Sequence, residues 1–217
     1  MYKNEIKIIW GVKMKIGILA LQGDVREHAN SLMKLGAEPI KVKSPEDLAD
    51  IDALIIPGGE STTIGLLMKK YKLDNAIKEK HKNGMPIYGT CAGAIILAKD
   101  VIGSKQPKLA LADISIKRND YGRQIDSFEA ELSIKDVGNF NGVFIRAPTI
   151  KRFYNGIEVL SEHKNNPVMV RQHNLLLTTF HPELTNDTRV HEYFLNMAKE
   201  YKEVRDMQRE IEENNGL

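Results

Sequence analysis

The sequence holds a single cysteine, and it stands in the pattern Gly89-x-Cys91-x-Gly93. Glycines at this spacing are typical of a nucleophile elbow, a sharp turn between a strand and a helix that exposes a strained nucleophile. A helix that begins behind Cys91 favours the thiolate, and the N–H group of Ala92 can point toward a developing oxyanion. The pattern therefore predicts a cysteine nucleophile, whereas a lone cysteine without such glycines is more often a buried structural residue.

A thiol nucleophile needs a base, and the best candidate is His181 in His181-Pro-Glu183, directly after the apolar run 175–180. Glu183, two residues further on, can accept the second imidazole N–H and so fix the tautomer. We therefore predict a triad of Cys91, His181 and Glu183. The other histidines lack this combination and are expected on the surface or in packing, without a metal: His28, His81, His163, His173 and His191.

A second oxyanion donor is predicted in the loop Pro57-Gly-Gly-Glu-Ser61, which follows another apolar strand. The N–H group of Gly59 is the predicted donor, because this loop and Cys91 should share one edge of the sheet. Taken alone, the loop fits a tight turn between a strand and a helix equally well.

The elements that must position these residues begin with a nearly continuous apolar stretch at 15–21, which is typical of a strand buried on both faces of a parallel sheet. An amphipathic helix is predicted over 25–33, followed by strands at 38–42 and 53–56. Ser61 and Thr62 are suited to capping the next helix, which runs toward Lys70.

The second half of the chain has a different sequence pattern from the first half. Between Leu109 and Phe180 the turn residues and short apolar runs predict antiparallel strands. The C-terminal segment has one apolar face at helical spacing and should pack on the sheet: Val190, Tyr193, Phe194, Met197, Ala198, Tyr201 and Val204. Its last dozen residues are charged and expected to fray. The pattern as a whole predicts one α/β/α domain with a mostly parallel sheet and extra antiparallel strands.

The composition of the chain argues against some classes of function. The 217 residues suit one domain, and 31 basic against 29 acidic side chains make nucleic acid an unexpected partner. No run approaches the length of a membrane span, and the single cysteine fits a reducing cytoplasm. We expect an N-terminal extension or upstream start at 1–13, the functional domain at 14–206 and a charged tail at 207–217.

The elbow together with His181-Pro-Glu183 resembles class I (triad) glutamine amidotransferases, which have a flavodoxin-like fold. Within that class, the chain from Met14 to about Asp206 is similar to the family of glutaminase subunits of pyridoxal 5′-phosphate synthase. Many other class I domains carry glutamine where Ile95 stands here, and this difference agrees with that family. The segments that carry the closer resemblance are 19–28, 57–63, 118–123, 126–129, 143–148 and 161–163.

The resemblance implies roles for further residues. Gly59, Glu60 and Ser61 match the family's glutamine-binding loop, Arg118 matches its glutamine-contacting arginine, and Ile145-Arg146 match its second contact segment. From the residues alone, arginines such as Arg118 and Arg146 are more often surface charges.

The implied activity is hydrolysis of L-glutamine to L-glutamate and ammonia, without a metal or organic cofactor. Ammonia would pass to a separate synthase subunit in a hetero-oligomer, and docking would activate the glutaminase. Two alternatives stay open at this point. One is the glutaminase of another amidotransferase, such as the imidazole glycerol phosphate system, and the other is a non-catalytic interaction protein on the same scaffold.

Overall fold

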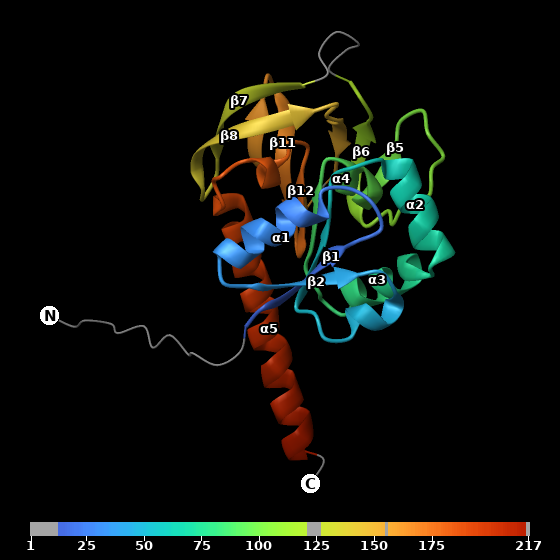
Figure 1. Ribbon diagram of the computed structural model, residues 1–217, viewed down its shortest axis with the longest axis vertical. Helices are drawn as coiled ribbons and strands as arrows, with labels where there is room; N and C mark the ends of the chain where they lie inside the picture. The colour runs from blue at the N-terminus through green and yellow to red at the C-terminus, as the bar shows by residue number, and fades with distance from the viewer. Residues whose placement is uncertain (1–12, 121–126, 155, 216–217) are drawn as a thin grey trace, which may run out of the picture.

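The computed structural model describes residues 13–120, 127–154 and 156–215 (Figure 1). Most of the expected extension at 1–13, and residues 121–123 and 126 of two motifs, lie outside the described residues. The strands are β1 Lys15–Leu19, β2 Glu38–Val42, β3 Ala53–Ile56, β4 Ile87–Thr90, β5 Ala98–Val101, β6 Ala112–Lys117, β7 Ser127–Ile134, β8 Gly138–Ile145, β9 Thr149–Phe153, β10 Glu158–His163, β11 Asn166–Gln172 and β12 Leu175–Thr178. The helices are α1 Val25–Lys34, α2 Ser61–Lys70, α3 Leu73–Lys82, α4 Ala92–Leu97 and α5 Arg189–Asn215, with short 3-10 turns η1 Pro45–Leu48 and η2 Pro182–Leu184.

The central sheet has seven strands in the order β10-β11-β12-β4-β3-β1-β2. Strands β12, β4, β3, β1 and β2 are parallel, and the antiparallel pairs β10–β11 and β11–β12 extend this sheet at one side. The prediction of a mostly parallel sheet with antiparallel additions is confirmed. Its register places Gly89 opposite both Ile56 and Leu177, so the segments after β3, β4 and β12 leave the sheet at one edge.

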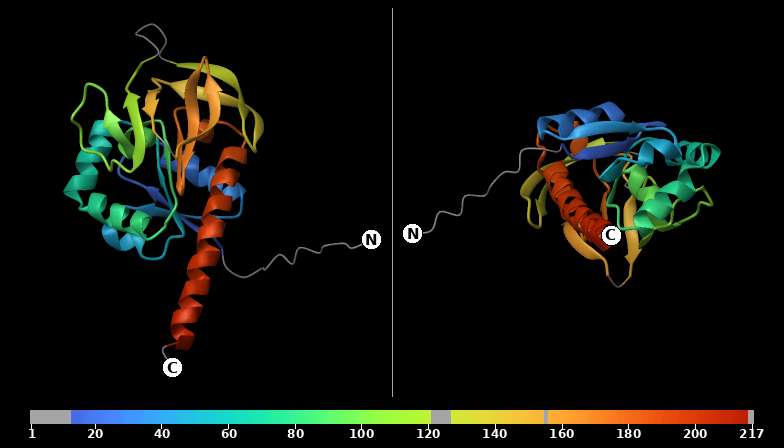
Figure 2. Two further views of the ribbon diagram at one scale, coloured as in Figure 1. Left: turned by 180° about the vertical axis from the view of Figure 1, so that it is seen from behind. Right: turned by 90° about the horizontal axis from the view of Figure 1, so that it is seen from below.

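Helices cover both faces of the sheet (Figures 1 and 2). Side chains of α2, α3 and α4 join one buried apolar cluster, and those of α1, α5 and the β7–β8 hairpin join the other. A small sheet, β5-β6-β9, packs beside the first cluster. Both clusters continue into the sheet, because its central strands are apolar on both faces.

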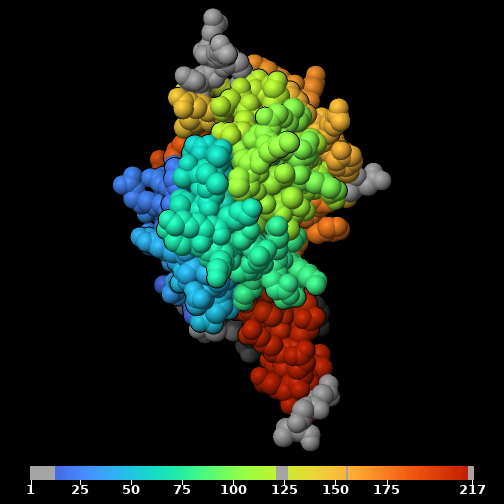
Figure 3. Space-filling view, turned by 90° about the vertical axis from the view of Figure 1, so that its right-hand side faces the viewer, coloured from blue at the N-terminus to red at the C-terminus, as the bar shows by residue number. Residues whose placement is uncertain are grey.

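Helix α5 is longer than the surface that it covers, and its C-terminal part projects beyond the body of the molecule (Figures 1 and 3). Val190, Phe194 and Ala198 are fully buried, as the apolar stripe predicts. The prediction is wrong for Val204, which is 55% exposed because the helix has passed the sheet at that point. The chain also stays helical to Asn215, where fraying was expected.

The N-cap of α2 differs from the expectation. Glu60, not Ser61 or Thr62, caps this helix, because its carboxylate accepts hydrogen bonds from the backbone N–H groups of Thr62 and Thr63. Ser61 is the first helical residue and is buried. Among the described residues, no helix is both long and apolar enough to cross a membrane.

Candidate active site

Cys91 directly follows β4 and occupies the N-cap position of α4, without a capping hydrogen bond from its side chain. Its backbone has φ 47° and ψ −99°, a strained conformation for a non-glycine residue. The flanking glycines permit this turn, because a Cβ on Gly93 would lie 2.0 Å from the carbonyl oxygen of Ile56 and one on Gly89 would lie 2.6 Å from the carbonyl carbon of Gly93. The predicted elbow is therefore present as a structural feature, with the thiol at the edge where the strands end.

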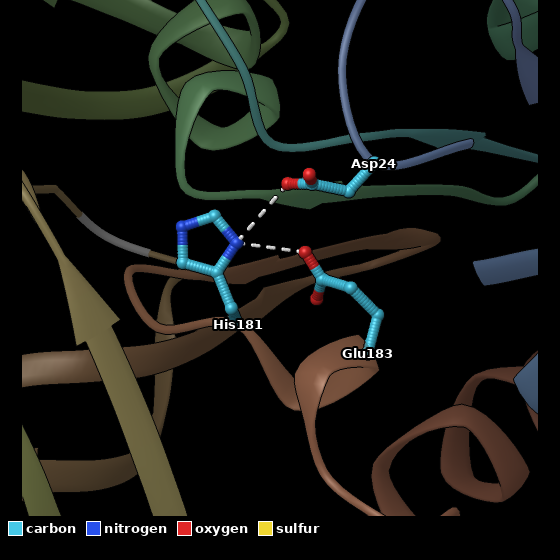
Figure 4. A group of neighbouring side chains, drawn as sticks. All are labelled: Asp24, His181 and Glu183. Carbon is cyan, nitrogen blue, oxygen red and sulfur yellow. Dashed lines mark hydrogen bonds and ion pairs between the residues drawn. The ribbon is translucent and has the colours of Figure 1, made fainter. Parts of the chain in front are cut away.

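His181 follows β12 at the same edge, and its ring is almost fully buried. Its Nδ1 lies 2.7 Å from Oε1 of Glu183 and 3.5 Å from Oδ2 of Asp24, so one N–H faces two carboxylates (Figure 4). Glu183 comes from η2, whereas Asp24 lies in the loop before α1. The Nδ1–H hydrogen bond to Glu183 leaves the second ring nitrogen of His181 available for chemistry.

The charges around this ring favour its protonated form. Burial alone would lower the pKa of His181, but hydrogen bonds with Asp24, Cys91 and Glu183 raise it above the usual value. Burial raises the pKa of Glu183, and its hydrogen bond with His181 opposes that effect. An imidazolium between a thiol and two carboxylates is the environment that stabilises a cysteine thiolate.

The loop after β3 lies directly against this group. A Cβ on Gly58 would lie 2.4 Å from Cε1 of His181, and a Cβ on Gly59 would lie 2.5 Å from Oε1 of Gln22. Gly59 also has φ +148°, which favours glycine. The side chain of Gln22 fixes the loop from the other side, because Oε1 accepts the N–H group of Glu60 at 2.7 Å.

Arg118 is held in place by side chains from α2, from the N-cap residue that precedes it and from the loop before β6. Its guanidinium donates to Thr62 Oγ1 at 3.0 Å, to Gln106 Oε1 at 2.9 Å and to Glu60 Oε1 at 2.9 Å. Such a fork is oriented by its partners and is suited to binding a carboxylate. Ser61 instead turns its hydroxyl toward Gln106, at 3.3 Å.

These segments enclose a pocket of about 400 Å³, a size typical of small-molecule sites. Every predicted site residue except Glu183 lines it, and Glu183 lies behind His181: Gly59, Glu60, Ser61, Cys91, Ala92, Arg118, Ile145, Arg146 and His181. The structure thus brings the predicted site residues together, although they are spread over more than half of the chain.

Two groups of residues at this site were not predicted. Gln22 and Asp24 line the pocket and contact the Gly59 loop and His181, respectively. His28 and His191 were expected at the surface or in packing; both are fully buried, His28 beside Glu183 and His191 in contact with His28. Asp24 and His28 belong to a motif that carried the resemblance, but nothing in the sequence places them against His181 and Glu183.

Comparison with known proteins identifies the family. The model of the SNO glutamine amidotransferase family matches residues 18–200. The chain belongs to this family. The pyridoxal 5′-phosphate synthase subunit PdxT of Thermosipho africanus is 50% identical over 187 residues, which are 86% of this chain and all of that protein. The protein of the same name from Geobacillus kaustophilus is 52% identical over 190 residues, 87% of this chain and 97% of that protein.

Solved structures agree with membership of the SNO family. A crystal structure described as a glutamine amidotransferase superposes with a TM-score of 0.83 at 47% identity, and the match covers 85% of this chain and 98% of the matched chain. The structure of PurLQS from Thermotoga maritima shares the fold alone, with a TM-score of 0.63 at 17% identity and coverage of 85% of this chain and 99% of the matched chain. The resemblance and the fold class stated from the sequence are confirmed.

Proposed function

We propose that this chain is the glutaminase subunit of a pyridoxal 5′-phosphate synthase, which hydrolyses L-glutamine to L-glutamate and ammonia and delivers the ammonia to a synthase subunit. Relatives about 50% identical over most of the chain carry the name of that subunit. The observation that carries the chemistry is the 2.7 Å hydrogen bond between His181 and Glu183 at a pocket that also contains the strained Cys91. A cytoplasmic setting is part of the proposal, because a chain with a single cysteine fits a reducing environment.

In the proposed mechanism, the thiolate of Cys91 attacks the side-chain carboxamide of glutamine. The backbone N–H groups of Gly59 and Ala92 donate to the oxyanion of the tetrahedral intermediate, and such a donor is often worth about 3 kcal/mol. His181 gives its proton to the leaving nitrogen, which departs as ammonia, and a γ-glutamyl thioester remains on Cys91. Glu183 keeps the imidazole oriented throughout.

Water completes the cycle. His181, now neutral, takes a proton from the water as it attacks the thioester, and the second tetrahedral intermediate releases glutamate and the Cys91 thiolate. Arg118, already oriented by Glu60 and Gln106, would bind the α-carboxylate of the substrate. Glu60, Ser61, Ile145 and Arg146 complete the glutamine pocket.

The test is glutamate release from glutamine by the purified chain, measured with and without its cognate synthase subunit. The proposal expects release that the synthase subunit stimulates and that Cys91→Ala abolishes. Release that survives Cys91→Ala would refute the nucleophile assignment. A demonstrated complex without any release would favour a non-catalytic role for this scaffold.

A further inference from the structure

Two histidines that the proposed mechanism does not use meet behind the active site. His28 lies on α1 and His191 on α5, and both side chains are fully buried. His28 Nδ1 lies 2.9 Å from His191 Nε2, within hydrogen-bond distance. Burial lowers the pKa of both rings, so both are neutral and each carries one N–H donor.

The other nitrogen of His28 faces the triad. His28 Nε2 lies 3.1 Å from Oγ1 of Thr90, the residue before Cys91, and 3.6 Å from Oε1 of Glu183. The same Oε1 accepts the hydrogen bond from His181, while Oε2 is buried without a hydrogen-bond partner among the described residues. A buried carboxylate in this position depends on the few donors and dipoles that face it.

The contacts select one tautomer for each ring. If His28 carried its hydrogen on Nδ1, the lone pair of Nε2 would face the carboxylate of Glu183 and repel it. With the hydrogen on Nε2, His28 donates to Thr90 Oγ1 at 3.1 Å and turns the positive end of this N–H dipole toward Glu183 Oε1 at 3.6 Å, while its Nδ1 accepts the Nε2–H of His191. This choice leaves His191 Nδ1 as a bare acceptor, in agreement with the absence of a partner for that atom among the described residues.

We propose that His28 is a positioning residue for the proposed glutaminase reaction: its Nε2–H, oriented by His191, holds the carboxylate of Glu183 ionised and directed at His181. The inference depends on the proposed function in one respect, because the reaction that His28 would support is the proposed hydrolysis of glutamine. It assigns a role to α1 and α5, which otherwise only cover one face of the sheet.

The proposal has a pH signature. A donor near a carboxylate favours its ionised form, so removing the Nε2–H raises the pH at which Glu183 becomes protonated. A protonated Glu183 no longer stabilises the His181 imidazolium, so the reactivity of Cys91 with an alkylating reagent should fall at that pH. The titratable groups that face Glu183 are His181, Asp24, His28 and Tyr88, with His191 behind His28.

The first experiment measures alkylation of Cys91 by iodoacetamide as a function of pH, on the full chain without glutamine or synthase. His28→Leu should move the acid limb of this profile upward by roughly one pH unit. His28→Gln, whose amide can place a donor near the position of Nε2, should restore the wild-type profile. His191→Phe, which removes the nitrogen that orients His28, should shift the limb in the same direction and serves if His28→Leu does not fold.

The matched control is His81→Leu, the same substitution in a half-buried histidine of α3, before β4 and away from Cys91. It should leave the acid limb in place. In the complex with the synthase subunit, His28→Leu should lower kcat for glutamine roughly tenfold with KM unchanged.

Two results overturn the inference. The first is an acid limb that does not move in His28→Leu or His191→Phe. The second is a loss of reactivity that is equal at every pH and is not restored by His28→Gln. A wild-type complex without glutamate release would refute the proposed function instead. The alkylation profile would still test the role of His28 in that case.

Discussion

Gly58 lies so close to the His181 ring that a single methyl group would disturb it. In Gly58→Ala the new Cβ would lie 2.4 Å from Cε1 and 2.8 Å from Nδ1 of His181, so the ring must shift from its present position. A displacement of about 1 Å in a catalytic group can cost roughly 100-fold in rate. We expect kcat for glutamine to fall by that order in the complex, measured by steady-state kinetics.

Gly65→Ala is the matched control for this prediction. Its Cβ would lie 2.3 Å from the carbonyl oxygen of Pro107, so the clash is as severe but does not touch His181. We expect Gly65→Ala to lower the melting temperature while kcat stays within about threefold of the wild type. Equal kcat values for the two variants would contradict the assignment of His181 to the chemistry.

Arg118 offers a prediction about binding rather than rate. Its guanidinium donates to three side chains at once, a geometry that a lysine ammonium cannot reproduce. If Arg118 binds the α-carboxylate of glutamine, Arg118→Lys should raise KM roughly tenfold and change kcat little, because this contact is the same in the ground and transition states. Arg152→Lys, outside the pocket, should change neither. A fall in kcat at constant KM would place Arg118 in the chemistry instead.

At the scale of residues, the sequence predicts those site residues that lie close to their motif partners along the chain. Cys91 is recognisable from its glycines and Glu183 from its distance of two residues to His181. Asp24 and His28 could not be placed in the same way, because their contacts with His181 and Glu183 cross more than 150 residues of chain. Such contacts depend on how helix α1 packs on the sheet, which no local pattern specifies.

At the scale of elements, α5 is joined to the sheet by a charged cluster as well as by its apolar face. Asp52, 2% exposed, accepts hydrogen bonds from Lys202 at 3.0 Å, from Arg205 at 2.9 Å and from the backbone N–H of Lys15 at 2.9 Å. Asp52→Ala removes the shared acceptor, so the partly buried ammonium of Lys202 loses its carboxylate partner and Arg205 is left with its ion pair to Asp206. We expect a loss of about 3 kcal/mol in the free energy of unfolding, measured by urea denaturation.

The control is Glu158→Ala, which breaks the exposed pair with Lys135 and should cost less than about 1 kcal/mol. Asp52 precedes β3, at the edge of the sheet away from Cys91. The reactivity of Cys91 in folded Asp52→Ala should therefore match the wild type. Similar stability losses in the two variants would show that Asp52 does not hold α5.

The elements that the sequence predicts well are those that the core alone determines. The apolar strands and the buried part of α5 follow from periodicity. Glu60 was missed as the N-cap of α2 because Ser61 and Thr62 are better caps by residue type, and its pairing with Arg118 depends on the tertiary structure. Val204 was misplaced because periodicity does not show where the sheet ends.

At the scale of the whole molecule, the site exists because three parallel strands end at one edge. The register of β3, β4 and β12 brings the Gly59 loop, Cys91 and His181 to that edge, and α1 and α5 close it from one face. This arrangement buries polar groups, among them histidines whose charged form is unfavourable in the interior.

That interior predicts how stability depends on pH. Burial lowers the pKa of His191 to about 4, whereas a histidine in the unfolded chain has a pKa near 6.5. Between about pH 4 and about pH 6.5, the unfolded chain therefore binds a proton at His191 that the folded chain does not bind. Stability therefore rises with pH in this window and is lost as pH falls, and His28 acts in the same direction. The raised pKa of His181 makes stability depend on pH in the opposite direction. The contribution of His191 is therefore measured as the difference between the wild type and a variant that lacks this histidine. From about pH 7.5 to about pH 5, the wild type should lose about 2 kcal/mol more unfolding free energy than His191→Gln. Parallel losses in urea denaturation of the two proteins would mean that His191 is protonated within the fold.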